Sequence, residues 1–371
     1  EVTMSDFDAA EELAVTNSRI DGLEAKFNNF EAGSFSETTS LSGSASFQLG
    51  AVDGSTVTEA VTSTYSYDLD LNTSFTGDDN LYVGIETGNS AFGTANDFVT
   101  DNSGGGADTL SVTSLYYTFP LGEYEVAVGP KLDNDDLMPT TISKYSDKFF
   151  MAGQPLTAAD FSSAPGITGA GFAIGRTFDN GFNASASVIG TTSNSLLTKE
   201  GVDTYTLSAG YDADSYGLGL IYADVDDACS FIAGYQTCAS LGVSAIGASS
   251  TTLGAYWTPN DGKTTLSATY GVFSGEITGA TVEDLSSFHV GVDHEVGSGV
   301  LSAAIKQQDF FTVSGSTVSA DSLGEFAEIY YTYDVNDSVE VTGGVSFAMG
   351  DETGVYWLDR TAVGAEATFK F

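Results

Sequence analysis

The sequence predicts an all-β transmembrane barrel of about sixteen antiparallel strands. Three observations lead to this fold class. Apolar and polar residues alternate in segments of about ten residues, short turn sequences separate these segments, and no stretch of 18 apolar residues exists that could form a membrane-spanning helix. Because side chains on a strand point alternately to two faces, each segment has one apolar and one polar face. Lipid would contact the first face and water the second.

The last predicted strand, 359–371, shows this alternation clearly. Val363, Phe369 and Phe371 belong to an alternate set that is apolar apart from one threonine. The other set contains residues such as Glu366 and is polar or small. A strand of this length that ends the chain on an aromatic residue is typical of a barrel with an aromatic girdle at the membrane edge.

The same pattern recurs along most of the chain. Tyr65 and Leu69, for example, alternate with Asp68 and Asp70. Turn sequences such as Asp179-Asn-Gly lie between the segments. The predicted strands cover residues 40–51, 61–76, 79–88, 108–119, 122–131, 166–178, 180–191, 201–212, 214–225, 244–258, 262–274, 285–297, 299–310, 322–335, 337–350 and 359–371.

The chain is strongly acidic, with 51 acidic and 11 basic residues and a net charge of −40. This charge excludes nucleic-acid binding, which needs clustered lysine and arginine. Acidic surface is usually just solvated, so no cofactor is expected. If an acidic loop holds a metal, the ion would be a structural Ca²⁺, because calcium prefers oxygen ligands. The candidate ligands are Asp133, Asp135 and Asp136, although their spacing is not that of a defined calcium loop.

Residues 1–33 differ in kind from the barrel formed by 34–371. Their apolar residues follow heptad spacing with charges between them, which favours a short periplasmic coiled-coil helix. The alternative is a single amphipathic helix that lies on the barrel or plugs it, since Gly22 weakens the helix by about 1 kcal/mol. The chain opens on Glu1 without an apolar leader, as expected of a processed or trimmed product. The residues assigned to a three-stranded coil are Arg19, Ile20, Leu23, Glu24, Phe27 and Phe30.

Residues 132–165 are too many for a turn and show little alternation. Five of the six prolines lie in or beside this stretch, which argues against a central strand. Its apolar residues favour an ordered structure, so the stretch is predicted to fold into the lumen as a constriction loop. Residues 137–178 carry a net charge of +1, whereas the rest of the chain carries −41.

A basic constriction inside an acidic lumen would bias which ions pass. Arg176 is the least secure member, because it shares the parity of Phe172 on the lipid face of its strand. Either a bulge resets the register there, or the arginine reaches out to the membrane interface. For the lysines, the alternative is ordinary surface charge on a mobile loop. The residues predicted to line the constriction are Lys131, Lys144, Lys148, Arg176 and Asp147.

The cysteines and histidines suggest no catalytic chemistry. Cys229 and Cys238 lie nine residues apart between two strands, and an even pair outside the cytoplasm predicts a disulfide. His289 and His294 have no evident acidic partner by spacing, and no Gly-x-Ser-x-Gly motif precedes a helix. An enzyme is therefore not expected.

The order of these parts resembles a known family. A heptad segment, then Phe35-Ser-Glu-Thr-Thr-Ser-Leu-Ser-Gly-Ser-Ala-Ser-Phe47, then the terminal Phe371 is similar to the Som-type outer-membrane porins of cyanobacteria, a branch similar to the carbohydrate-selective porins. The resemblance implies a homotrimer of sixteen-stranded barrels in outer-membrane lipid and lipopolysaccharide. It also implies that the coil follows an S-layer-homology domain that grips peptidoglycan-linked polymer, a domain that this sequence does not include.

Pattern and resemblance together predict a passive diffusion channel in the cell outer membrane. The expected solutes are inorganic ions and small hydrophilic nutrients, with sugars among them by resemblance. The alternative is an adhesin, or an envelope-anchoring scaffold barrel, whose lumen is plugged. A soluble β-solenoid would need a short fixed repeat, and the sequence has none.

Overall fold

The computed structural model describes residues 38–371 with interruptions. The predicted coiled coil, Asp147 and the predicted disulfide between Cys229 and Cys238 lie outside the described residues. The ranges not described are 1–37, 55–59, 91–97, 99, 101–102, 104–107, 147, 149–167, 191–195, 198–202, 227–245, 260–261, 278–280, 283, 315–316 and 350–358.

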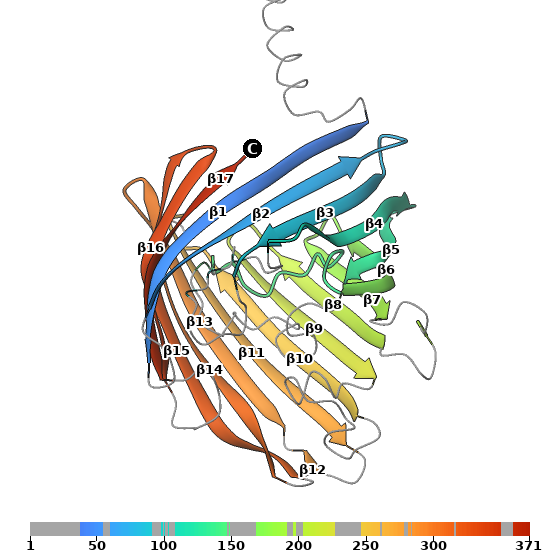
Figure 1. Cartoon of the computed structure of the whole chain (residues 1–371). Coiled ribbons are helices and arrows are strands. Elements are labelled where there is room, and N and C mark those ends of the chain that lie inside the picture. The colour runs from blue at the N-terminus through green and yellow to red at the C-terminus, as the bar shows by residue number, and fades with distance from the viewer. Residues whose placement is uncertain are drawn as a thin grey trace, which may run out of the picture.

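The described residues form a closed barrel (Figure 1). Sixteen long strands pair antiparallel with their neighbours in chain order, and β1 pairs with β17 to close the sheet. The short strand β12 pairs in parallel with β15. The strands are β1 (Thr39–Gly54), β2 (Ala60–Thr73), β3 (Asn80–Gly88), β4 (Ser111–Leu121), β5 (Tyr124–Asp133), β6 (Thr168–Thr177), β7 (Phe182–Gly190), β8 (Asp203–Asp212), β9 (Tyr216–Asp226), β10 (Ile246–Trp257), β11 (Thr264–Ile277), β12 (Thr281–Val282), β13 (Leu285–Val296), β14 (Gly299–Ser314), β15 (Thr317–Asn336), β16 (Val339–Met349) and β17 (Arg360–Lys370).

The sixteen long strands confirm the predicted fold class. Each overlaps one predicted strand, and most ends agree within a few residues. The hairpin of β14 and β15 is longer than predicted, since pairing continues to Ser314 and Thr317. A register shift between Phe310 and Thr312 breaks the alternation of apolar and polar residues there. The predicted strand therefore ends before the observed one. Among the described residues, no helix is long and apolar enough to cross a membrane.

The barrel is apolar outside and polar inside. On β1, Phe47 and Leu49 are 55% and 57% exposed, whereas Ser46 and Gln48 are 0% and 1% exposed. The last strand repeats this arrangement, with Phe369 exposed and Glu366 buried. A surface so rich in exposed apolar side chains is stable in lipid and not in water. The parity predicted from the sequence therefore holds on these strands.

The seam between β1 and β17 uses the terminal aromatic residue. The backbone N–H of Gly43 donates to the carbonyl of Phe371 at 3.0 Å, and the N–H of Phe371 donates back to Gly43 at 3.1 Å. The ring of Phe371 stacks on Tyr67 with centroids 5.9 Å apart, and Phe369 contacts Phe47 edge to face at 5.7 Å. The end of the chain is thus fixed to the first two strands.

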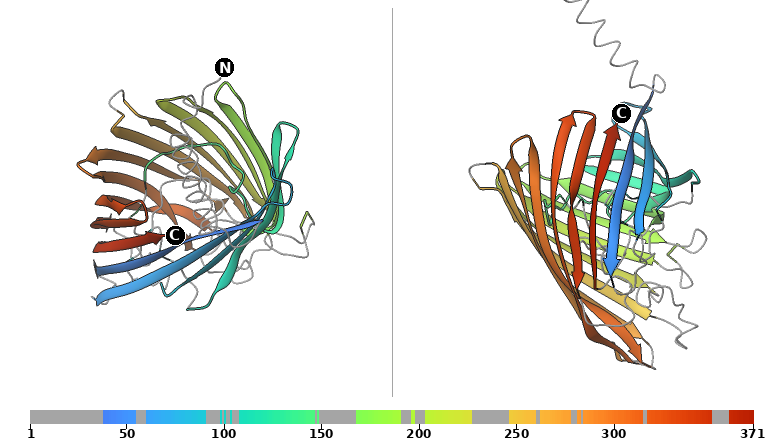
Figure 2. Two further views of the ribbon diagram at one scale, coloured as in Figure 1. Left: turned by 90° about the horizontal axis from the view of Figure 1, so that it is seen from above. Right: turned by 60° about the vertical axis from the view of Figure 1, so that its left-hand side comes forward.

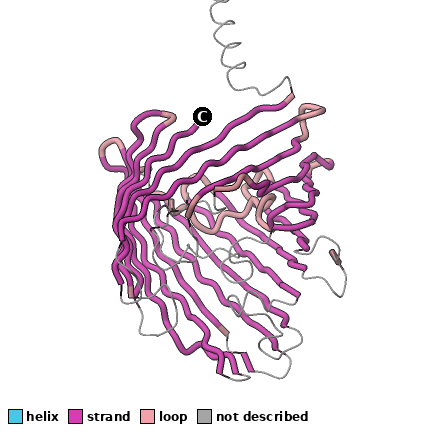
Figure 3. Tube along the Cα trace, viewed as in Figure 1, coloured by secondary structure: helices cyan, strands magenta, loops and turns pink. Residues whose placement is uncertain are grey.

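Short turns join strands at one end of the barrel, which we name the turn end; the opposite end is the loop end. Gly181 and Gly297 occupy turns with φ of 89° and 66°, a region in which residues with a Cβ are strained. Phe371 lies at the turn end, and the longer connections start from the loop end (Figures 1 and 2). One of these connections, after β5, runs back into the barrel (Figure 3).

Candidate functional site

Residues 134–146 and Lys148 form what we name the inner segment, because they lie along the inner wall of the barrel. The segment begins at β7 and β8, where the amide of Asn134 donates to Thr206 at 3.2 Å and Ser187 donates to the Asn134 carbonyl at 2.9 Å. Further along, the hydroxyl of Thr140 contacts Asn183 and Ser208, both at 2.8 Å. These side chains belong to the buried polar face of their strands, so the segment lies inside the lumen.

Glycines on neighbouring strands make room for the inner segment. A Cβ on Gly175 of β6 would lie 2.7 Å from the Leu137 carbonyl oxygen, and one on Gly254 of β10 would lie 2.2 Å from that of Ile142. Such distances are shorter than real Cβ contacts, so only glycine allows the approach. The glycines that approach the segment in this way are Gly175, Gly210, Gly219, Gly254 and Gly291, from β6, β8, β9, β10 and β13.

Tyr145 is the aromatic residue of the inner segment, and it is buried. Its hydroxyl donates to Glu328 on β15 at 2.5 Å, and its ring lies 5.1 Å from that of His289 and 6.3 Å from that of Tyr330. Burial raises the pKa of Tyr145, so the hydroxyl stays a donor at physiological pH. Tyr145 thereby anchors the segment to β15, on the inner wall of the barrel.

Ser146 completes this anchor. Its hydroxyl lies 2.7 Å from both Asp293 on β13 and the hydroxyl of Tyr330 on β15. Its backbone N–H also donates to Asp293 at 3.1 Å. A half-buried carboxylate is stabilised by donors around it, so these bonds stabilise Asp293 as well as the segment.

The two predicted lysines of the inner segment have different environments. The ammonium of Lys148 forms an ion pair with Glu340 on β16 at 2.8 Å, and Lys370 approaches the same carboxylate at 3.3 Å. Lys144 is exposed, and its ammonium lies 4.1 Å from the centre of the Tyr256 ring. Lys144 therefore presents its charge to the lumen, whereas that of Lys148 is neutralised.

Lys131 is exposed on β5 and donates to the carbonyl of Val112. The prediction of a lumen-facing Lys131 rests on alternation along the strand. The register between β5 and β6 shifts between Gly129 and Leu132, so the alternation does not carry through to this residue. The structure brings Lys131 into no contact with Lys144 or Lys148.

Arg176 lies on the outer face of its strand, so its predicted place in the constriction is not supported by the strand register. The pairing of β6 with β7 is continuous from Ala170 to Thr177, so no bulge turns the arginine inward. Its neighbour Gly175 faces the lumen, which puts Arg176 on the outer face. There it pairs with Glu123 at 2.6 Å and lies 4.3 Å from the centre of the Phe178 ring. This is the interfacial position that the sequence left as the alternative.

The part of the wall to which the described residues of the inner segment are not hydrogen-bonded is acidic. Asp68 and Glu86 are cross-strand partners on β2 and β3, and Asp70 accepts from the Tyr82 hydroxyl at 2.5 Å. No hydrogen bond of the described inner-segment residues reaches β2 or β3. We name Asp68, Asp70 and Glu86 the acidic wall. The sequence predicted no pore-lining role for these residues, although Asp68 and Asp70 have the polar parity of their strand.

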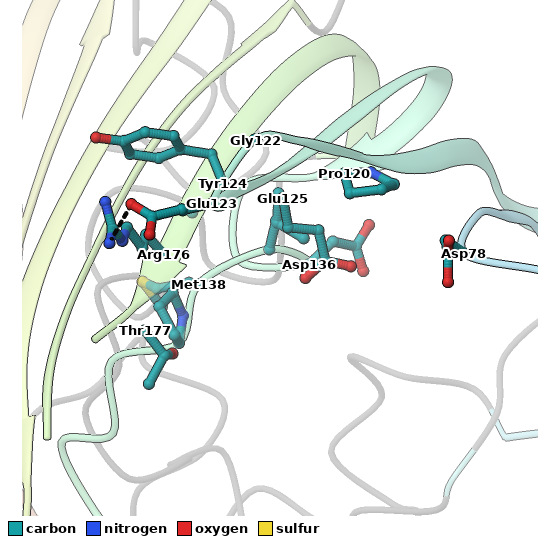
Figure 4. A pocket seen from close by; sticks show the side chains of 13 residues that line it. Asp78, Pro120, Gly122, Glu123, Tyr124, Glu125, Asp136, Met138, Arg176 and Thr177 are labelled. Atoms are coloured by element: carbon teal, nitrogen blue, oxygen red, sulfur yellow. Dashed lines mark ion pairs between the residues drawn. The ribbon is translucent and has the colours of Figure 1, made fainter. Parts of the chain in front are cut away.

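A pocket of about 530 Å³ lies at the turn-end side of the inner segment (Figure 4). Glu125 of β5 and Asp136 of the segment line it, with the Arg176–Glu123 ion pair at one side. Desolvation by the surrounding protein raises the pKa of Asp136 to about 6, although the hydrogen bond from the Asp133 backbone N–H lowers it and the side chain keeps contact with solvent. Glu125 and Asp136 thus add two carboxylates beside the ion pair that lines this pocket.

The three carboxylates predicted as metal ligands are not gathered around a common point. Asp136 instead accepts the backbone N–H of Asp133 at 2.8 Å and closes a turn. Among the described residues, no three His, Cys, Asp or Glu side chains form a group that could hold a metal ion. Asp135 shares the turn, and its carbonyl accepts the N–H of Met138 at 2.9 Å.

Comparison with known proteins gives one distant sequence relative. No family model matches the chain. An uncharacterized protein of Nostoc sp. is 25% identical over 382 residues, which cover 90% of this chain and 65% of that protein. The chain thus spans about two-thirds of the length of this curated relative.

Solved structures with a similar fold are outer-membrane proteins. The anion-selective porin from Comamonas acidovorans has a TM-score of 0.66 at 14% identity, covering 90% of this chain and 99% of the porin. Pseudomonas putida OprB has a TM-score of 0.64 at 12% identity, covering 90% and 94%. The trimer form of OmpT, an outer membrane protein of Vibrio cholerae, has a TM-score of 0.63 at 11% identity, covering 90% and 100%. The chain therefore has the barrel fold of bacterial outer-membrane porins.

Proposed function

We propose that the protein is a passive diffusion channel of the cell outer membrane for inorganic ions and small hydrophilic nutrients. The observation that carries this proposal is the acidic wall, to which no described residue of the inner segment is hydrogen-bonded, inside a barrel whose outer face is apolar. Water and solutes need a polar path, and the lumen face of β2 and β3 offers one beside the inner segment. No covalent chemistry is proposed, and the likeness to the Comamonas porin supports a channel.

The channel should prefer cations. Asp68, Asp70 and Glu86 line the open wall, while Lys148 is paired and Lys144 is the exposed cation of the described inner segment. A ring of carboxylates along a pore attracts cations and repels anions. The similar Comamonas protein is described as anion-selective, so the fold alone does not fix the sign of selectivity.

The assembly and partners remain proposals. A homotrimer is supported by the likeness to the trimer form of OmpT. In that assembly the turn end would face the periplasm, residues 1–33 would form the coil, and lipid and lipopolysaccharide would surround the apolar face. Attachment to peptidoglycan would need a further domain. The disulfide Cys229–Cys238 and a structural Ca²⁺ stay predictions.

The test is electrical. The purified protein is reconstituted in a planar bilayer under a salt gradient, and single-channel conductance and reversal potential are measured. Conductance steps in groups of three with a reversal potential of cation sign are expected. A correctly folded protein that gives no conductance would contradict the channel and favour the adhesin or plugged scaffold. Anion selectivity would contradict the role of the acidic wall while leaving the channel intact.

A further inference from the structure

Described residues of the connection that follows β3 in the sequence and leads to β4 also lie inside the barrel. Its described residues Phe98, Thr100 and Ser103 lie against the inner face of the seam where β1 meets β17. Phe98 is only 1% exposed. Described residues of two connections, after β3 and after β5, therefore lie inside the barrel, and no sequence pattern predicted this for the first of them.

The ring of Phe98 fills a space that two glycines leave free. Gly50 of β1 and Gly364 of β17 are cross-strand partners. A Cβ on Gly50 would lie 2.2 Å from the Phe98 ring, and a Cβ on Gly364 would lie 2.5 Å from it. The backbone N–H of Phe98 donates to the hydroxyl of Thr62 on β2 at 3.2 Å. The ring is therefore held on the seam by shape and by a polar bond.

Polar contacts hold the next residues to the same seam. The hydroxyl of Thr100 donates to the buried carboxylate of Glu366, which also accepts from the amide of Gln48 at 3.0 Å. The backbone N–H of Thr100 donates to the hydroxyl of Ser103 at 2.9 Å. A buried carboxylate without donors is unfavourable. The hydrogen bond from Thr100 therefore stabilises Glu366 of the wall and also fixes Thr100 to the wall.

We propose that Phe98, Thr100 and Ser103 belong to a second pore-narrowing segment, which determines the size of solute that passes. Phe98 belongs to one buried apolar cluster with Tyr145 of the inner segment, together with Tyr330 of β15 and residues of β1 and β17. The described residues of the two segments therefore occupy adjoining parts of the wall, from β6 round to Thr62 on β2. The solute path is displaced toward the acidic wall on β2 and β3. This inference rests on the proposed channel function.

The test compares pore size in matched variants. Phe98→Ala removes the ring, and Gly364→Leu fills the space beneath it. Phe47→Ala, a truncation on the lipid face, and Gly343→Ala, where an added Cβ has its nearest neighbour at 3.8 Å, are the controls. Single-channel conductance and exclusion of polyethylene glycols of graded size are measured after heat-modifiable gel mobility has shown that each barrel is folded.

The expected result for Phe98→Ala is a conductance increase of about 1.5-fold or more and entry of larger polymers, because the narrowest cross-section controls both. Gly364→Leu displaces the ring from the seam and should change the polymer cut-off, while the controls match the wild type. A conducting wild type with unchanged conductance and cut-off in both variants would overturn the second segment. A wild type that does not conduct would instead overturn the channel. If Phe98→Ala fails to fold, Thr100→Val gives the same readout.

Discussion

Lys144 and Lys148 lie four residues apart on the inner segment, yet only Lys148 is paired. Its partner Glu340 is buried and is shared with Lys370. An ion in the lumen therefore senses little of the Lys148 charge, whereas Lys144 lies over Tyr256 with an exposed side chain. The electrical roles of the two lysines should differ, although their sequence contexts are similar.

Lys144→Glu should raise the cation-to-anion permeability ratio by about 2- to 5-fold, because a unit charge a few ångström from a passing ion contributes about 1 kcal/mol in water. Lys148→Gln should change the ratio less. It should instead weaken the folded barrel by about 1.5–3 kcal/mol, since Glu340 loses a charged hydrogen bond. Reversal potentials and urea unfolding measure the two effects. Equal shifts in selectivity would show that the ion pair does not matter.

Asp79 organises the turn between β2 and β3. Its carboxylate accepts the Tyr117 hydroxyl at 2.6 Å, the Phe75 N–H at 2.9 Å and the Thr76 N–H at 2.8 Å. The hydrogen bond from Tyr117 is the main reason that the pKa of Asp79 lies well below its ordinary value. This carboxylate is therefore satisfied by protein donors.

Asp79→Asn should destabilise the barrel more at about pH 7 than at about pH 3. The folded pKa is lowered, so the stabilisation is complete above the unfolded value of about 3.9 and is lost as the pH falls below it. Free energies of unfolding of wild type and variant at the two pH values measure this. Asp78→Asn, a neighbouring exposed residue, is the control. A difference that does not depend on pH would contradict the assignment.

The inner segment and the strands beneath it form one element-scale unit. Ile142 of the inner segment packs against Gly254 of β10, in the space that a side chain at position 254 would fill. Gly254→Val should push residues 140–146 toward the middle of the lumen, lower the conductance and cost about 1–3 kcal/mol of stability as overpacking does. Gly343→Ala is a glycine replacement with room for the added atom. Unchanged conductance in a folded Gly254→Val barrel would mean that the segment can move without affecting the pore.

Strands were predictable from the sequence, and contacts inside the lumen were not. Alternation is a local property, so it marked strands such as β17 and the polar parity of Asp68. It could not tell Gly254 or Gly364 from a glycine that merely weakens a strand, because their role lies in a segment more than 100 positions away. For Arg176, parity with Phe172 indicated the outer face, and the strand register agrees with that alternative. Phe98 was missed because a single apolar pair, Phe98 and Val99, in a long connection carries no period.

The whole molecule combines a net charge of −40 with an uneven distribution of it. Much of this charge lies on exposed parts of the chain, where it acts through solvent. The acidic wall acts at close range, because passing ions move along it. The two contributions to cation preference can be separated by varying the salt concentration, because screening weakens the effect of the distant exposed charges before that of the acidic wall.

Cation preference should therefore fall as ionic strength rises, without vanishing. The Debye length shortens from about 10 Å at 0.1 M to about 3 Å at 1 M salt, which screens the loops but not the contacts at the acidic wall. Neutralising the wall by Asp68→Asn with Glu86→Gln should lower the preference at both salt concentrations. Asp337→Asn, in an exposed turn between β15 and β16, should leave the cation preference unchanged at high salt. Reversal potentials at fixed salt ratio and varied mean concentration give the comparison. If the wall variant matched the wild type at high salt, selectivity would reside elsewhere in the lumen.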